Sequence, residues 1–176
     1  MTFSADFLRW LEVLEPSEGK FANDPADAGG ETWYGITVRD WPEILTVPVA
    51  ERRQRAREIA WREYWTVAKC DRPEMRWPLN LVLADWCFNS GDPEGPSVPE
   101  KALQRLLGVK PDGDIGKVTL AAVAAACAYG GTVGLARKLQ EKRVRYFANL
   151  IQARPSQVKF VEGWWVRTMR IDFELA

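Results

Sequence analysis

The side chains best suited to chemistry in this chain are carboxylates, and two of them, Glu18 and Asp27, stand nine residues apart. The sequence contains no histidine, which excludes Ser-His-Asp and Cys-His catalysts and His-ligated zinc sites. Hydrolysis of a glycosidic bond needs one carboxylic acid to protonate the leaving oxygen and a second carboxylate to activate water or stabilise the transition state. A glutamate beside an apolar helix end suits the acid, and an aspartate in a polar loop suits its ionised partner.

The loop that separates these two acids consists largely of turn-forming Asn, Asp, Pro and Gly residues. Such a loop could hold a cation instead, through Asp24, Asp27 and Glu31. Their spacing does not match the EF-hand pattern, so the sequence predicts no metal site. Spacing alone, however, does not distinguish Glu18 and Asp27 from the rest of the 24 acidic side chains.

An amphipathic helix must position Glu18, because apolar side chains recur at helical spacing at the start of the chain, at Phe3, Phe7, Trp10, Leu11 and Leu14. The pattern predicts that this helix stops near Pro16. Glu18 would then lie just past a rigid, buried element, where a catalytic group can be held accurately. Short extended pieces around Phe21 and 33–36 predict a small β-hairpin beside the loop.

Helical patterns dominate the rest of the chain. A second amphipathic helix is expected around Ala56 to Tyr64, with most of its arginines facing solvent, and a third from Leu79 to Trp86. Further helices are expected at about 98–107, 117–128, 133–151 and 156–171. The fold class is therefore predicted to be mainly α.

A proline-rich segment, GDPEGPSVPE at 91–100, predicts a boundary between two lobes, 1–95 and 96–176, packed as one compact unit. Residues 1–95 carry 11 basic and 17 acidic side chains, whereas residues 96–176 carry 13 and 7. This division is typical of a catalytic lobe joined to a lobe that grips an anionic polymer, although surface charge can also diverge without purpose. On the basic side, Lys138, Lys142 and Arg145 form a stripe at helical spacing.

The N-terminal segment lacks the basic region of a secretory signal, and the longest apolar run, Leu120 to Tyr129, is too short to cross a bilayer. We therefore expect no membrane insertion, and export that depends on a helper. Three widely spaced cysteines favour free thiols over a disulfide framework or a zinc knuckle.

The segment from Glu18 to Thr37, EGKFANDPADAGGETWYGIT, resembles the signature of glycoside hydrolase family 108, roughly EGGYVNDPxDxGGxTNYGIT. Members of that family are N-acetylmuramidases, known as phage endolysins and bacterial secretion activators. The chain departs from the pattern at Lys20, which replaces a glycine, and at Trp33, which replaces an asparagine. Neither change removes an acid, but both affect the wall of the expected cleft.

The resemblance continues over nearly the whole chain. The segments REYW at 62–65 and DWCFNSG at 85–91 are similar to family motifs, and LQRLLGVKPDGDIGKVTL at 103–120 resembles the opening of the family's predicted peptidoglycan-binding region. The residues expected at the substrate are Thr32, Trp33, Tyr34, Asp85 and Asn89. Trp33 is expected there because sugar rings pack on aromatic faces, and Asp85 and Asn89 because a spacing of four residues places them on one stripe of the third helix. The alternative for the last two is structural, with Asn89 as a helix cap and Asp85 as a partner for the basic second helix.

The resemblance implies a lysozyme-like helical fold and hydrolysis of the β-1,4 bond between N-acetylmuramic acid and N-acetylglucosamine in bacterial peptidoglycan, with Glu18 as general acid. It implies no cofactor, no metal and no nucleic-acid partner. We expect a monomer that is made in the cytoplasm, crosses the membrane with a holin or another export helper and acts in the periplasm. The alternatives are a lytic transglycosylase that uses Glu18 alone, and a wall-binding protein without catalytic activity.

Overall fold

The computed structural model describes residues 2–23, 30–90 and 97–175. These residues form two compact units, 1–67 and 68–176. Residues 91–96 of the expected linker lie outside the described residues.

In the first unit, helix α1 (Ala5–Glu18) begins at Ser4, whose hydroxyl accepts a hydrogen bond from the backbone N–H of Phe7 at 3.3 Å. Four residues of the predicted apolar stripe, Phe7, Trp10, Leu11 and Leu14, are buried, whereas Phe3 precedes the helix and is partly buried. The helix continues two residues beyond Pro16, and it ends at Glu18 because Gly19 adopts a left-handed φ of 61°. Glu18 is therefore the last helical residue, where the sequence had placed it just outside the helix.

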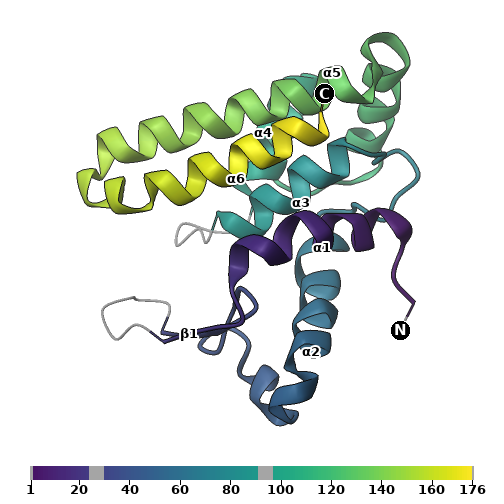
Figure 1. The fold of residues 1–176 in the computed structure, drawn as a ribbon. Coiled ribbons are helices and arrows are strands. Elements are labelled where there is room, and N and C mark those ends of the chain that lie inside the picture. The colour runs from purple at the N-terminus through teal and green to yellow at the C-terminus, as the bar shows by residue number, and fades with distance from the viewer. Residues whose placement is uncertain (1, 24–29, 91–96, 176) are drawn as a thin grey trace. The chain divides into compact units, whose positions relative to one another are not determined.

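A three-stranded antiparallel sheet follows α1 and contains β1 (Phe21–Asn23), β2 (Glu31–Trp33) and β3 (Ile36–Thr37) (Figure 1). The turn between β2 and β3 has two residues, Tyr34 and Gly35, with φ of 51° and 79°. Positive φ at both positions is the backbone geometry that favours a tight hairpin. The predicted hairpin is confirmed, and a third strand extends it.

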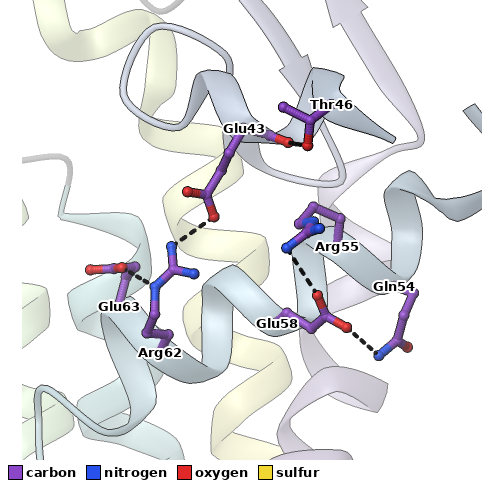
Figure 2. Close-up of polar contacts among 7 residues, drawn as sticks. All are labelled: Glu43, Thr46, Gln54, Arg55, Glu58, Arg62 and Glu63. Atoms are coloured by element: carbon purple, nitrogen blue, oxygen red, sulfur yellow. Dashed lines mark hydrogen bonds and ion pairs between the residues drawn. The ribbon is translucent and has the colours of Figure 1, made fainter. Parts of the chain in front are cut away.

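The first unit is completed by the short helices η1 (Pro42–Thr46) and η2 (Val49–Glu51), by α2 (Arg52–Ile59) and by the π-helical segment η3 (Ala60–Trp65). Its core is aromatic: Trp10 stacks on Trp65 with ring centroids 5.7 Å apart, and both are fully buried. Polar contacts cover the surface of these helices, including Arg62 with Glu43 and Glu63, and Glu58 with Arg55 and Gln54 (Figure 2).

The second unit is helical, with α3 (Leu79–Asn89), α4 (Val98–Leu107), α5 (Lys117–Ala153), η4 (Pro155–Phe160) and α6 (Val161–Glu174). Helices α5 and α6 run antiparallel side by side (Figure 1), joined by the stacked rings of Phe147 and Trp164 at 4.5 Å. Helix α3 is buried along nearly its whole length, including Trp86. The three cysteines are free, and only Cys70 is fully buried.

A buried glutamine organises the loop between α4 and α5. The Gln104 side chain donates to the Asp112 carboxylate at 2.8 Å and to the Asp114 carbonyl at 2.9 Å, and its oxygen accepts from the Gly113 N–H at 2.8 Å. These bonds fix the DGD segment of the motif that resembles a peptidoglycan-binding region.

By length and composition α5 could span a membrane, and 22% of its most apolar 18-residue window is buried. The helix is interrupted at Gly131, where φ is 72° and ψ is 156°, inside the uncharged stretch from Val118 to Ala136. In a bilayer, such an interruption would leave backbone N–H and C=O groups without partners, each at a cost of several kcal/mol. The interruption also explains why the sequence predicts two helices, at 117–128 and 133–151.

Candidate active site

Glu18, the predicted general acid, lies at the end of α1 and is partly buried. The chain turns sharply at Gly19 and enters β1 two residues later. The backbone N–H of Tyr34 donates to the Lys20 carbonyl at 3.3 Å. This bond attaches the β2–β3 turn to the segment that follows Glu18.

The predicted substrate residues Thr32, Trp33 and Tyr34 are consecutive on β2 and its turn, and all three are partly buried. Thr32 pairs with Ala22 on one side, and its hydroxyl donates to the Gly30 carbonyl at 3.3 Å. The structure therefore places these three residues on one sheet and its turn, in the same compact unit as Glu18.

The indole of Trp33 is held from three directions. Its Nε1–H donates to the Glu31 carboxylate at 2.7 Å, and its ring lies 4.7 Å from that of Phe21 on the paired strand. The guanidinium of Arg52, at the start of α2, lies 4.2 Å from the centroid of the ring. The sequence alone did not indicate a role for Arg52, although the tryptophan at the position of the signature's asparagine already indicated that this wall of the site differs from the family pattern.

A second arginine contact fixes α2 against α1. The Glu15 carboxylate, one turn before Glu18, accepts from Arg57 at 2.7 Å and also pairs with Arg53. Burial by itself raises the pKa of Glu15, but the hydrogen bonds and charges of these two arginines outweigh it and lower the pKa below its usual value. Arg53 and Arg57 belong to a helix whose arginines were expected mostly to face solvent, and they hold the helix that carries Glu18.

Asp27, the predicted second carboxylate, lies outside the described residues, as does Asp24. Of the acids in this loop, the structure describes Glu31, which is committed to the indole of Trp33. Among the described residues, no group of three or more His, Cys, Asp or Glu side chains is arranged to hold a metal ion.

Asp85 belongs to the second compact unit, where it is 1% exposed on α3. Its carboxylate accepts two hydrogen bonds from Arg167, both at 2.9 Å, and lies 2.9 Å from the Arg143 guanidinium. Burial raises the pKa of Asp85, but the charges of Arg167 and Arg143 dominate and lower it to about 2. A carboxylate enclosed in this way holds α5 and α6 to α3 and is not open to a glycan.

Asn89, the last residue of α3, is partly buried, and its Nδ2 is buried without a hydrogen-bond partner among the described residues. The following residue, Ser90, donates its hydroxyl to the Cys87 carbonyl at 3.2 Å and so satisfies one carbonyl at the helix end. The Asn89 side-chain amide nitrogen therefore has no hydrogen-bond partner among the described residues, in contrast to the carboxylate of Asp85 one turn earlier.

Comparison with known proteins gives two family matches. Residues 11–91 match the model described as Glycosyl hydrolase 108, and residues 98–169 match the model described as Predicted Peptidoglycan domain. Among solved structures, the one titled "Structure of Brucella abortus SagA" is similar with a TM-score of 0.74 and 25% sequence identity, over 97% of this chain and 93% of that chain. A search of curated proteins finds no match. The similarity covers almost the whole of both chains and confirms the mainly α, lysozyme-like fold class.

Proposed function

We propose, from the premise that this chain belongs to glycoside hydrolase family 108, that it is a muramidase which cleaves the β-1,4 bond between N-acetylmuramic acid and N-acetylglucosamine. Family membership and the second matched region indicate a glycoside hydrolase that acts on peptidoglycan, and hence outside the cytoplasm. We also propose that the enzyme acts in the periplasm and that it is delivered through a holin.

Glu18 is our choice for the general acid, and the observation that carries it is its place at the end of α1, directly before the sheet that holds Thr32, Trp33 and Tyr34. The carboxyl group stands on a helix whose other face is buried and whose preceding turn is held by ion pairs from α2. A group supported in this way keeps its position while a substrate binds and reacts.

Replacing Glu18 with Gln tests this assignment. The substitution removes the transferable proton while keeping the size of the side chain. Because general acid–base assistance contributes about 10²–10⁴-fold to a rate, we expect Glu18→Gln to lose at least about a hundredfold in the hydrolysis of purified sacculi, with little change in melting temperature. Glu12→Gln, a change at an exposed position on the same helix, is the matched control. Activity near that of the wild type in Glu18→Gln would contradict the assignment.

Asp27 is our choice for the second carboxylate, supported by the similarity of the loop to the family signature. Asp27→Asn should then reduce hydrolysis strongly while the binding of sacculi is retained. If the variant stays fully active, Glu31→Gln is the next variant to test. Because Glu31 also accepts the indole N–H of Trp33, that substitution removes a structural hydrogen bond as well as a carboxylate. Mass spectrometry of the products separates hydrolysis, which yields reducing ends, from a transglycosylase reaction, which leaves 1,6-anhydro ends.

Binding to the wall is the role that we propose for the second matched region. The basic stripe on α5, Lys138, Lys142 and Arg145, is exposed along its length. If the stripe contacts the carboxylates of stem peptides, substituting all three residues with Gln should weaken sedimentation with sacculi and flatten its dependence on ionic strength, because exposed charge pairs are screened by salt. The same affinity at every ionic strength would show that the stripe is only a solvated helix face.

A further inference from the structure

Arg52 differs from the other arginines near the start of α2. Arg53 and Arg57 pair with Glu15, and Arg55 pairs with Glu58. Within the described part of the chain, the structure records no carboxylate partner for Arg52, and its Nε is buried without a hydrogen bond. The charge of this side chain is not neutralised there by a described acid.

What holds Arg52 in place is an aromatic ring. Its guanidinium lies 4.2 Å from the centroid of Trp33, a separation at which a cation is attracted to an indole face. The indole cannot turn away easily, because its Nε1–H is bonded to Glu31 and its ring contacts Phe21. The pair therefore joins the start of α2 to strand β2 and forms a surface in which the positive guanidinium of Arg52 lies over the ring and the carboxylate of Glu31 lies at its edge.

This surface depends on a residue that sets the chain apart from the family signature it resembles. The signature has asparagine where this chain has Trp33, and an asparagine offers no ring on which a guanidinium can stack. With the ring on one side, the terminal Nη–H groups of the Arg52 guanidinium, unlike its buried Nε–H, can meet the two oxygens of a carboxylate. The chemistry that fits Arg52 is therefore a planar anion brought to the sheet by the substrate.

We propose that Arg52, held over Trp33, binds a free carboxylate of the peptidoglycan stem peptides and makes the enzyme prefer glycan strands that still carry those peptides. The inference rests on the proposed muramidase function, since it requires a glycan strand bound along the sheet next to Glu18. It assigns Arg52 a role in substrate selection and no part in the cleavage of the bond.

The test compares two substrates prepared from the same sacculi, namely solubilised glycan strands that carry stem peptides and strands from which an amidase has removed them. For wild type, kcat/KM should be higher on the peptide-bearing strands. In Arg52→Gln the ratio of the two kcat/KM values should fall about tenfold, which corresponds to about 1.4 kcal/mol. Trp33→Asn, which restores the residue of the family signature, should lower the ratio similarly, because Arg52 then loses its support. Arg52→Lys, which keeps the charge but not the planar donor set, should fall between.

Arg62 provides the matched control, since it also lies over a tryptophan, 5.9 Å from the centroid of Trp41, but its charge is paired with Glu43 and Glu63 (Figure 2). Arg62→Gln should leave the ratio as in wild type. The inference is overturned if Arg52→Gln keeps the wild-type ratio, or if Arg62→Gln lowers it equally. The proposed function fails separately, if wild type cleaves neither substrate.

Discussion

Asp85 shows how a single buried acid can hold several helices together. Its carboxylate faces two arginines from α5 and α6, and Arg143 is fully buried while Arg167 is 8% exposed. A buried ion pair contributes little compared with a well-packed apolar replacement, but removing one partner leaves an uncompensated charge and costs about 3–5 kcal/mol. Because two guanidinium groups depend on this one carboxylate, the loss of Asp85 should fall at the upper end of that range.

Asp85→Asn should therefore destabilise the protein strongly and also change the pH dependence of its stability. The folded-state pKa of Asp85, about 2, lies below the ordinary value of 3.8. The carboxylate thus contributes about 2 kcal/mol above pH 4, and this contribution is lost as the pH falls from 4 through 2. Urea denaturation at a series of pH values should show this loss in wild type but not in the variant. Parallel pH profiles for the two proteins would contradict the role assigned to Asp85.

At the residue scale, the local features of the site could be predicted from the sequence, whereas contacts between distant residues could not. The order of Glu18, the loop and Thr32 to Tyr34 could be predicted because these residues lie within one short segment and carry a recognisable motif. The partners of Asp85 lie at positions 143 and 167, and no local pattern connects charges so far apart in sequence. The contact of Arg52 with Trp33 was missed for the same reason, since it joins a helix to a strand across two intervening short helices.

At the scale of elements, periodicity predicted the helices well, because each buries one face and displays it in the sequence at a spacing of three and four residues. The positions of the helix ends were predicted less accurately. A proline was expected to stop α1, yet the helix continues past Pro16 to the left-handed Gly19, a conformation that L-residues rarely adopt. The chain stops the helix there with a glycine, which places Glu18 on the helix itself.

The interruption of α5 provides a prediction at this scale. Gly131 has φ of 72° and ψ of 156°, a region that is open almost only to glycine, whereas its neighbour Gly130 is helical. A Cβ at either position would meet no atom within 4 Å, so backbone conformation alone distinguishes them. Gly131→Ala should cost about 1–3 kcal/mol of stability, whereas Gly130→Ala should be neutral or stabilise by up to about 1 kcal/mol. Chemical denaturation of both variants measures the difference, and equal stabilities would show that α5 does not need the left-handed residue.

At the scale of the whole molecule, the compact units and the motifs divide the chain at different places. The family matches end and begin near the proline-rich linker, at 91 and 98, whereas the first compact unit ends at Val67. Helix α3 is the reason for the difference, because it belongs to the first matched region but packs with α4 and α5 in the second unit. Sequence motifs follow the chain, and they do not record which helices share a core.

This arrangement predicts which fragments fold. A fragment of residues 68–176 keeps α3 and the Asp85 ion pairs, and it should unfold cooperatively in urea. A fragment of residues 96–176 lacks α3, so Arg143 loses its buried counter-charge and the apolar surface that α3 covers on α4 and α5 meets water. We expect this shorter fragment to show a broad transition with a reduced m-value, because m follows the surface exposed on unfolding. The complementary fragment 1–95 should be insoluble, since the buried face of α3 would be exposed. Circular dichroism and urea titration of the fragments decide the matter: a cooperative transition in 96–176, or a soluble and active 1–95, would mean that the linker separates two independent domains.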